Sequence, residues 1–433
     1  MLFNNITIID ENQNVQENMY VGVKGKKIAF IGDSKPYEDF GESYDGKGRL
    51  LMSGFYNTHA HTPMTLLRGY GENMNLQDWL ETRIFPFEAK MNGQDIYWGT
   101  MLGLAESIRF GIVSTTDMYD FCPDMVKAYA EAGVKGNISR AILCFTDENL
   151  HDMERFTQAA DLFKNFHNSS DGRVKIDMSL HAEYTSTPKI VRQLAEYTKE
   201  IGTNMHVHVS ETKFEHEECK KRHGKTPLAY LSDLGLFDSP TTAAHCVHLE
   251  DGDIEILKQK GVTVASCPVS NLKLASGICN VPKLKAAGVN VALGTDGVAS
   301  NNSLNFIEEM KFFSLLHKGI FSEPAASSPR DTLYSATRAG AIAQGRRDCG
   351  LLKTGCAADL IVIDITKPNM NPAHDLVNNI VYSACAGDIV LTVADGEILY
   401  KDGEYMTIDI EKTVFEAQKS TDAILKKLAV NML

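Results

Sequence analysis

The spacing of apolar and polar residues divides the chain into two kinds of segment. Short β-type runs, separated by polar or glycine-containing turns, occupy both ends of the chain, at residues 6–9, 19–23, 27–31, 359–365 and 389–400. Asp395-Gly396 interrupts the last run, and this dipeptide is typical of a two-residue hairpin turn. We predict a small antiparallel sheet in the first fifty residues, and we expect the two chain ends to pair into one composite β-sandwich domain.

The middle of the chain has a different pattern of apolar and polar residues. Short apolar runs alternate there with segments of helical periodicity such as residues 99–110, 190–201 and 254–261. Alternating strands and helices predict a parallel sheet. Eight candidate strands lie at residues 54–59, 112–118, 134–143, 174–181, 204–209, 241–245, 262–267 and 289–296. Since eight strands close a (β/α)8 TIM-type barrel, the predicted fold class is α/β. The predicted domains are a barrel at 54–354, a composite β-sandwich at 1–53 plus 355–409, and a C-terminal helix at 410–433.

Composition limits the function. The chain of 433 residues carries a formal net charge of −13, whereas nucleic-acid binding draws on clusters of Lys and Arg that neutralise phosphates. Residues 1–14 show neither a basic segment nor a small-residue cleavage site, and no apolar stretch is long enough to span a bilayer. Nine cysteines without a Cys-x-x-Cys pair indicate buried free thiols in a reducing compartment. We expect a soluble cytoplasmic homo-oligomer that acts on a small molecule, with neither nucleic acid nor membrane as a partner.

Six polar residues lie at or just beyond the carboxyl ends of the predicted strands, where (β/α) barrels carry their chemistry. They are His59, His61, His181, His208, His245 and Asp296. His59 and His61 stand at positions i and i+2, so both imidazoles project from one face of a strand. Three neutral imidazoles, with His208 as the third, and the carboxylate of Asp296 leave a divalent cation with a net charge of about +1, which can acidify a bound water to near neutral pH.

Four residues near these strands, His206, Glu211, His245 and His248, have competing interpretations. His206 shares a strand face with His208, and we assign it to a deeper layer of the barrel because only His208 borders the loop that holds Glu211. Glu211 is either a solvated loop acid or a general base that takes a proton from water and passes it to the substrate. His245 ends the sixth strand and His248 follows it; we favour His245 as the residue that positions and polarises the attacking hydroxide.

Four motifs follow one another along the chain: NTHAHTPMTLLRG at 57–69, HVSET at 208–212, AAHCVH at 243–248, and LGTDG at 293–297 with SNN at 300–302. In these motifs the chain resembles the amidohydrolase superfamily, and within it the methylthioadenosine/S-adenosylhomocysteine deaminase branch, which is related to the s-triazine chlorohydrolases. The resemblance implies one divalent metal per chain, commonly Zn²⁺ with Fe²⁺ or Mn²⁺ as alternatives, held by His59, His61, His208 and Asp296. It also implies that Glu211 is the acid/base, that His245 contacts the hydroxide, and that Asp296 relays a proton to the leaving ammonia.

The same resemblance implies contacts with the substrate. Trp79 lies in a segment similar to a lid after the first strand, and Glu88 matches an acid that binds ribose hydroxyls. Arg140 matches an arginine that helps to hold the tail of the nucleoside, and His181 matches a histidine near the purine ring. Arg155 is a candidate for a second arginine at the tail.

Three functions compete on this evidence. The first is hydrolytic deamination, by an aminohydrolase acting on cyclic amidines, of an adenine-type nucleoside (S-adenosylhomocysteine, 5′-methylthioadenosine or adenosine) to the inosine-type product plus ammonia. The second is the same chemistry, or a chlorohydrolase reaction, on another N-heterocycle such as guanine, a pterin or an s-triazine. The third is a non-catalytic binding protein. Glu88 and Arg140 favour the first function over the second, and the complete metal and acid/base set argues against the third. Ala182-Glu183 and Ser266 depart from the family pattern, which often has Ser-Pro and a nearby histidine there.

Overall fold

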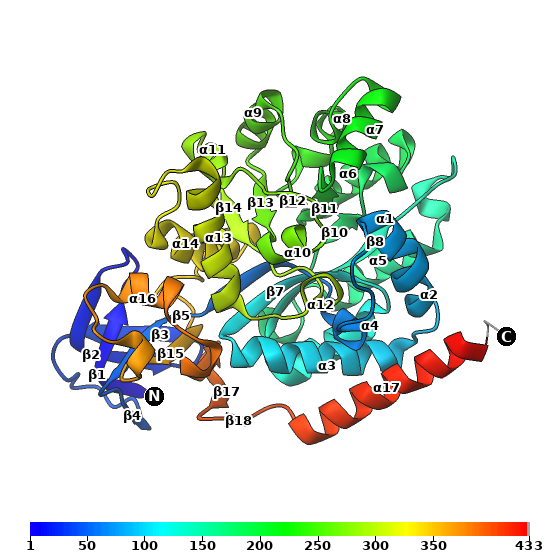
Figure 1. The fold of residues 1–433 in the computed structure, drawn as a ribbon. Coiled ribbons are helices and arrows are strands. Elements are labelled where there is room, and N and C mark those ends of the chain that lie inside the picture. Colours follow the sequence, from blue (N-terminus) through cyan, green and yellow to red (C-terminus); the bar gives the residue numbers. More distant parts are fainter. Residues whose placement is uncertain (431–433) are drawn as a thin grey trace.

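The computed structural model describes residues 1–430, so the last three residues of the predicted C-terminal helix lie outside the described part of the chain. Two sheets organise the structure, a central parallel barrel and a smaller mixed sheet built from both chain ends (Figure 1). The predicted α/β fold class with a TIM-type barrel is therefore confirmed. The domain boundaries proposed from the sequence stay a prediction.

All eight predicted barrel strands are present. Their bounds are β6 (Phe55–Ala60), β7 (Ile112–Tyr119), β8 (Lys135–Ile142), β9 (Val174–Ile176) with β10 (Met178–Leu180), β11 (Met205–Val209), β12 (Thr241–His245), β13 (Thr263–Ser266) and β14 (Val291–Leu293). The fourth predicted strand is thus two segments, interrupted at Asp177, whose buried carboxylate accepts hydrogen bonds from Nδ2 of Asn137 at 3.0 and 3.1 Å. β14 is shorter than predicted, so Asp296 lies beyond its end.

The barrel is nearly closed, because β6 and β14 meet through individual hydrogen bonds and not through a regular ladder. The amide of Asp296 donates to the carbonyl of His59 at 2.9 Å, and Oγ1 of Thr58 donates to the carbonyl of Leu293 at 2.7 Å. Between these edges the neighbours pair in parallel in the order β6, β7, β8, β10, β11, β12, β13 and β14. This seam brings two predicted metal ligands together from opposite ends of the barrel sequence.

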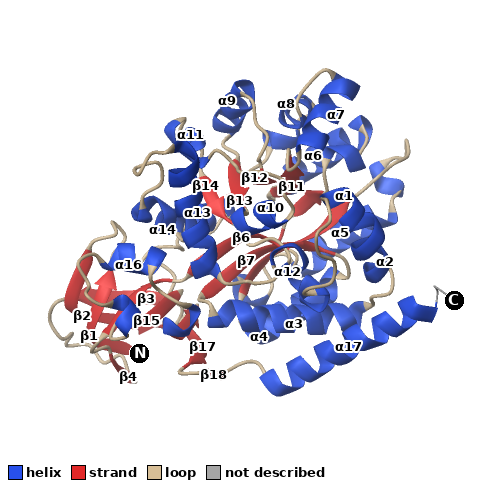
Figure 2. Ribbon diagram, in the orientation of Figure 1, coloured by secondary structure: helices blue, strands red, loops and turns tan. Residues whose placement is uncertain are grey.

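Helices surround the barrel (Figure 2). The outer helices are α3 (Gly93–Arg109), α4 (Cys122–Ala132), α5 (Glu154–Phe166), α6 (Pro188–Ile201), α7 (Lys213–His223), α8 (Pro227–Asp233), α9 (Asp251–Lys260), α11 (Val281–Ala286), α13 (Phe306–Phe321), α14 (Pro329–Ala336) and α15 (Arg338–Ala343). α3 begins at a capping box in which the side chains of Asn92 and Asp95 each accept from the other's backbone amide. Gly111, with φ of 77°, then turns the chain into β7.

Short helices lie near the carboxyl ends of the strands. They are η1 (Thr62–Leu67), α1 (Leu76–Trp79), the π-helical η2 (Leu80–Ile84), α2 (Phe85–Glu88), α10 (Pro268–Lys273) and α12 (Val298–Asn301). α1, η2 and α2 follow one another without a break, so the predicted lid is one helical segment containing a π turn. π turns are frequent at functional sites.

The mixed sheet has the strand order β18-β17-β16-β15-β5-β1-β2-β3, with β4 beside β1. Its strands are β1 (Leu2–Ile9), β2 (Val15–Lys24), β3 (Lys27–Gly32), β4 (Ser43–Asp45), β5 (Arg49–Ser53), β15 (Leu360–Asp364), β16 (Ile389–Ala394), β17 (Glu397–Lys401) and β18 (Glu404–Tyr405). The chain ends join where β5 pairs with β15. The expectation of a purely antiparallel arrangement in the first fifty residues is wrong, because β1 pairs in parallel with β4 and β5.

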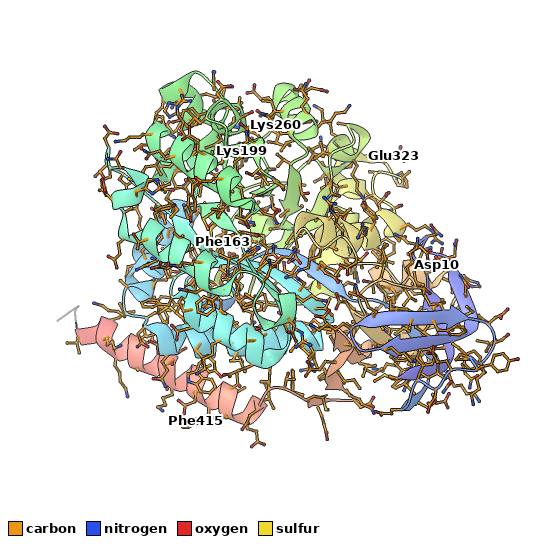
Figure 3. The ribbon with its side chains drawn as sticks, turned by 180° about the vertical axis from the view of Figure 1, so that it is seen from behind. Asp10, Phe163, Lys199, Lys260, Glu323 and Phe415 are labelled. Atoms are coloured by element: carbon orange, nitrogen blue, oxygen red, sulfur yellow. The ribbon has the colours of Figure 1, made fainter. Side chains whose placement is uncertain are left out.

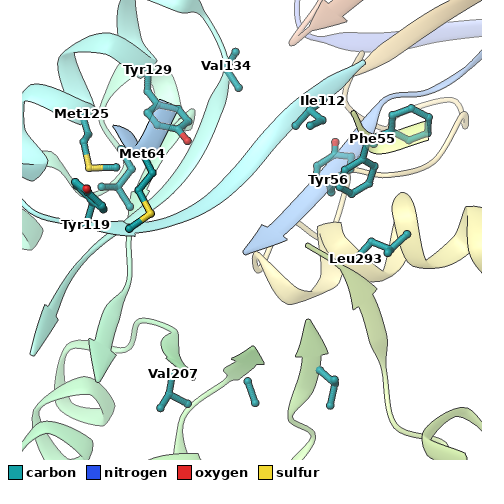
Figure 4. Close-up of a cluster of buried hydrophobic side chains, with 14 of the residues drawn as sticks. Phe55, Tyr56, Met64, Ile112, Tyr119, Met125, Tyr129, Val134, Val207 and Leu293 are labelled. Atoms are coloured by element: carbon teal, nitrogen blue, oxygen red, sulfur yellow. The ribbon is translucent and has the colours of Figure 1, made fainter. Parts of the chain in front are cut away.

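Buried apolar side chains hold the barrel strands in place (Figure 4). Phe55 and Tyr56 of β6, Ile112 of β7, Val207 of β11 and Leu293 of β14 are all fully buried. Burial of each such side chain contributes roughly 1.5–3 kcal/mol to folding. The strand ends, and the polar residues they carry, are therefore fixed by packing on several sides.

Two helices complete the chain, α16 (Leu376–Tyr382) and α17 (Ile410–Val430). α17 runs along α3 at the edge of the molecule, and Phe415 on its outer face is exposed (Figures 1 and 3). The hydroxyl of Thr421 donates to the carbonyl of Leu66 at 3.3 Å, so this helix also touches η1. Within residues 1–430 no helix combines the length and the apolar character needed to cross a membrane.

The nine cysteines are all free thiols. Eight of them are buried as expected from the sequence, but Cys385 is exposed because it lies in the loop after α16. The prediction of free thiols holds, and the prediction that every one is buried is wrong at this position.

Candidate metal and catalytic site

Each predicted metal-binding histidine has one ring nitrogen held by a neighbour. The three Nδ1 atoms are hydrogen-bonded as follows: that of His61 to the carbonyl of Met118 at 2.6 Å, that of His208 to the carbonyl of His181 at 2.7 Å, and that of His59 to Nε2 of His206 at 2.8 Å. An imidazole whose Nδ1–H donates to a carbonyl keeps the lone pair of Nε2 for a cation. The Nε2 atoms of His61 and His208 are therefore ready to act as ligands.

The free ligand atoms converge. Nε2 of His61 lies 3.3 Å from Nε2 of His208, and Oδ1 of Asp296 lies 3.4 Å from Nε2 of both His59 and His61. Donors bound tetrahedrally at about 2.0–2.1 Å from a zinc ion lie about 3.3–3.4 Å apart, so these spacings match such a site. Nε2 of His59 is buried and has no hydrogen-bond partner among residues 1–430. This environment suits an atom that binds a cation.

The carboxylate of Asp296 is oriented by its neighbours. Oδ2 accepts hydrogen bonds from the hydroxyls of Ser270 at 2.5 Å and Ser300 at 3.0 Å, and Oδ1 accepts from the amide of Gly297 at 2.7 Å. These bonds leave Oδ1 facing the histidines. A fixed second shell of this kind positions a metal ligand and tunes its basicity.

The charge states of these groups suit a divalent cation. Burial lowers the pKa of His59 to about 4 and holds the pKa of His208 well below its ordinary value, so both rings are neutral at pH 7. Burial alone would raise the pKa of Asp296, but the neighbouring imidazoles of His59, His245 and His61 outweigh it and hold the pKa well below its ordinary value. Neutral imidazoles with an ionised carboxylate form a common divalent-metal donor set.

His206 has a defined place in this site, behind His59. If Nδ1–H of His59 donates to His206, then Nε2 of His59 is free for a metal; the opposite tautomer would place a proton on that atom. Nδ1 of His206 is buried without a partner among residues 1–430. A metal on Nε2 of His59 would select one tautomer of the pair, and we therefore predict that His206 positions this ligand.

We expect His206→Phe to weaken zinc binding by about 10- to 100-fold, because loss of the partner of a ligating histidine releases its tautomer and its orientation. Chelator competition measures the zinc affinity. His248→Ala is the matched control, since that ring is half-buried and its Nε2 donates to the carbonyl of Ser276 at 2.8 Å. Equal zinc affinities of wild type and His206→Phe would contradict the positioning role.

Glu211 and His245 lie beside the ligand cluster. Oε2 of Glu211 is 3.8 Å from Nε2 of His245, whose Nδ1 donates to Oδ1 of Asn271 at 2.9 Å. Burial raises the pKa of Glu211 above its ordinary value. Burial alone would lower the pKa of His245, but the charges of Glu211 and Asp296 outweigh it and raise the pKa. Such a buried acid next to an imidazole can hold and move a proton during a reaction.

The backbone at the strand ends adopts uncommon conformations. His245 has φ of 70° and Asp296 has φ of 61°, both in the left-handed region that side chains other than glycine rarely occupy. Conformations of this kind persist where the surrounding structure over-determines them, and they cluster at functional sites. Here they turn the two side chains into the barrel mouth at the point where β12 ends and shortly after the end of β14.

Two adjoining cavities lie at this site. A small one of about 60 Å³ is lined by His61, His208, Glu211, His245 and Asp296, and also by Trp79. It shares Leu80, His181 and Tyr184 with a larger cavity of about 580 Å³. The larger volume lies in the usual range for small-molecule sites.

The predicted substrate residues Glu88 and His181 line the larger cavity. Oε1 of Glu88 accepts a hydrogen bond from the hydroxyl of Tyr119 at 2.5 Å, and burial raises the pKa of Glu88 to about 7. The indole Nε1–H of Trp79 is buried with no partner in the described part of the chain. Glu88 therefore presents a carboxyl group to the larger cavity, whereas the N–H of Trp79 is enclosed by protein although its ring lines the smaller cavity.

The two arginines lie on different sides of Asp120. Arg155 lines the larger cavity, whereas Arg140 lines a separate neighbouring cavity of about 380 Å³. Nε of Arg140 donates to Oε1 of Gln158 at 3.0 Å. Of the two predicted arginines, the structure thus brings Arg155, and not Arg140, directly to the cavity next to the metal cluster.

Sequence reasoning missed several residues that support the site. Ser270, Asn271 and Asp120 were not singled out, although Ser270 and Asn271 follow Pro268 directly after a strand. The available signal was the position of these polar residues just beyond strand ends, which is the criterion that identified His245 and Asp296. Their contacts depend on neighbours far apart in the chain.

Comparison with known proteins agrees with this geometry. A family model described as the Amidohydrolase family matches residues 50–399. The chain is 40% identical over 428 residues to a 5-methylthioadenosine/S-adenosylhomocysteine deaminase of Dictyoglomus thermophilum, covering 99% of each chain. It is 40% identical to a 5′-deoxyadenosine deaminase of Methanosarcina mazei, covering 94% of each. The crystal structure of an adenosine deaminase from Xanthomonas campestris with bound zinc superposes with a TM-score of 0.92 at 29% identity, over 98% of both chains.

Proposed function

The chain belongs to the amidohydrolase family, and from that premise we propose that it is a metal-dependent aminohydrolase that deaminates an adenine-type nucleoside to the inosine-type product. S-adenosylhomocysteine, 5′-methylthioadenosine, 5′-deoxyadenosine and adenosine form the substrate class, because similar proteins are named as deaminases of these compounds. The observation that carries the proposal is a cluster of possible ligand atoms, in which His59 groups with His61 and Asp296 and also with His208 and His245. This cluster lies beside Glu211, next to the cavity that contains Glu88.

We propose one divalent metal per chain, zinc in the first place, held by Nε2 of His59, His61 and His208 and by Oδ1 of Asp296. The unpartnered, buried Nε2 of His59 and the 3.3 to 3.4 Å spacings support this assignment. When bound, the metal supplies a Lewis acid that lowers the pKa of water toward neutrality.

The protein groups then account for the proton transfers. Glu211 takes a proton from the attacking water and delivers it to N1 of the adenine ring, while His245 hydrogen-bonds the attacking oxygen and polarises it. The oxygen adds to C6, and Asp296 relays a proton to the exocyclic amine. The C6–N bond breaks, ammonia leaves, and the inosine-type carbonyl remains. The raised pKa of Glu211 supports this role, since a carboxylate that is more basic than usual accepts a proton more readily.

The order of residues along the cavity suggests how the substrate lies. We place the purine at the part shared by the two cavities, against His181 and Trp79. The ribose hydroxyls then meet Glu88, and the 5′ substituent extends toward Arg155 and Asp120, with Arg140 acting on it from beyond Asp120. A base without a sugar would leave the Glu88 carboxyl with no hydroxyl to bind, so we favour nucleosides over free bases and triazines.

A screen for ammonia release tests this function directly. The zinc-loaded protein should release ammonia from adenine nucleosides and form the corresponding inosine-type products. Guanine, pterins and s-triazines should be turned over at least about 100-fold more slowly, because they lack the groups that the ribose site binds. Turnover of a sugar-free heterocycle at a rate above that of every nucleoside would overturn the substrate class.

We expect Glu88→Gln to reduce kcat/KM for adenine nucleosides. The loss of transition-state stabilisation should be about 1–3 kcal/mol, the scale of a hydrogen bond to a charged group. Activity on 9-methyladenine, which has no ribose, should change little. Glu81→Gln is the matched control, because Glu81 lines the same cavity but is exposed. A loss of equal size for nucleoside and sugar-free base would show that Glu88 does not bind the ribose.

A further inference from the structure

A charged cluster lies between the cavity beside the metal cluster and its neighbour. Asp120 directly follows β7 and lines both cavities. Its Oδ1 forms a salt bridge with Nη1 of Arg155 at 3.2 Å, and the same oxygen contacts Nη1 of Arg140. Asp120 thus pairs with Arg155, while Nη1 of Arg140 lies against the same oxygen and has no hydrogen-bond partner among residues 1–430.

Among the described residues that line the larger cavity, the other guanidinium is engaged too. Arg222 donates to Oε2 of Glu183 at 2.6 Å. The carboxyl-bearing residues that line the cavity outnumber its two arginines; they are Glu81, Glu88, Asp120, Glu215 and Glu218. An incoming anion would therefore meet an excess of acidic groups. Both arginines that line this cavity already pair with a carboxylate of the protein.

The rest of this wall is apolar. Phe85, Leu143, Phe145 and Phe214 line the same cavity, and Phe145 and Phe214 are largely exposed. Removing such surface from water favours a ligand whose tail is itself apolar. The cavity thus combines apolar walls with arginines whose charge is already compensated.

Building on the proposed function, we infer that Asp120 takes the place of a substrate carboxylate, so that this protein selects adenine nucleosides with an uncharged 5′ substituent over those whose tail ends in a carboxylate. A carboxylate tail must compete with Asp120 for Arg140 and Arg155, and like charges held close together repel each other. A 5′-methyl or 5′-methylthio group makes no such demand. Asp120 is therefore the specificity residue, because its carboxylate repels a substrate tail that ends in a carboxylate.

The opposite reading, in which Asp120 binds the ammonium group of an amino-acid tail, makes a different prediction. Oδ1 of Asp120 already pairs with Arg155 and lies against Nη1 of Arg140, so a third cation would have to share this oxygen. Under that reading, removal of the Asp120 charge would weaken the action on S-adenosylhomocysteine. Under our inference the same change strengthens it relative to uncharged tails.

The test compares wild type with Asp120→Asn by the ratio of kcat/KM for S-adenosylhomocysteine to kcat/KM for 5′-methylthioadenosine. We expect the wild-type ratio to be below about 0.1 and the variant to raise it about 10-fold, as charge complementarity changes specificity on that scale. The carboxamide of S-adenosylhomocysteine matches the acid in size and in its ammonium group, and its ratio should rise much less. Asp161→Asn is the control, because Asp161 is exposed and lines the cavity on the Arg140 side.

The outcomes separate this inference from the function on which it rests. If wild type releases no ammonia from any adenine nucleoside, the proposed function fails and the inference fails with it. If wild type deaminates 5′-methylthioadenosine but the ratio stays the same or falls in Asp120→Asn, only the inference is overturned. Two other results would also overturn the inference. The first is an equal rise of the ratio in Asp120→Asn for S-adenosylhomocysteine and for its carboxamide, since the effect would then not depend on the carboxylate. The second is an equal rise of the ratio in Asp161→Asn.

Discussion

Replacement of Glu211 by glutamine should lower kcat by about 10²- to 10⁴-fold, the contribution of a positioned acid/base group. Glutamine keeps the size of the side chain and its capacity for hydrogen bonds, including the contact from the hydroxyl of Ser276 at 3.4 Å. It cannot take the proton from water that the proposed reaction requires. Steady-state turnover of 5′-methylthioadenosine measures the loss.

The metal content separates this effect from damage to the ligand site. Elemental analysis of Glu211→Gln should still find about one zinc per chain, because Glu211 is not a proposed ligand. Glu218→Gln is the matched control, since Glu218 lines the adjoining cavity and pairs with Lys221 at 2.6 Å. A near-normal kcat for Glu211→Gln, or loss of its metal, would show that the acid/base has been assigned to the wrong residue.

Removal of the metal should abolish turnover, and zinc, iron or manganese should restore it. His208→Ala should lose the metal permanently, and its kcat should fall by about 10³-fold or more, because the Lewis acid contributes several kcal/mol to the reaction. Elemental analysis and ammonia release are measured on the same preparations. His248→Ala, which changes a histidine outside the ligand cluster, should keep both metal and activity.

The fold should survive this loss. The barrel core is formed by buried apolar side chains such as Phe55 and Leu293, which carry no metal-binding atom. Circular dichroism of the metal-free protein should therefore match that of the loaded protein. Two metals per chain, or full activity after verified removal of all metal, would contradict the proposed site.

Much of the fold could be predicted from the sequence, because the barrel strands are buried runs and the helices between them carry periodic apolar faces. The positions of His208, His245 and Asp296 followed from the same pattern, since residues at the carboxyl ends of parallel strands meet at one mouth. Local features were harder. The interruption at Asp177 depends on hydrogen bonds from Asn137 on another strand, which no local pattern records.

The direction of side chains also limited the prediction of the substrate site. Arg140 lies within β8 and points to the neighbouring cavity, whereas Arg155 of α5 reaches the larger one. Position along the chain places both arginines near the barrel mouth, but packing around Asp120 decides which cavity each one lines. The hydrogen bond from Ser270 to Asp296 could not be predicted from the sequence either, because the two residues lie in different segments of the chain.

The seam between β6 and β14 has a consequence for how the protein assembles. Asn57 and Thr295, which join through a hydrogen bond of 2.7 Å, are 238 positions apart in the chain. Contacts between such distant residues form late, because the chain between them must first be ordered. His59 and Asp296 flank this junction, so the complete ligand set exists only after the barrel has closed. We therefore expect metal uptake during refolding to follow closure of the barrel and to report when that closure is complete.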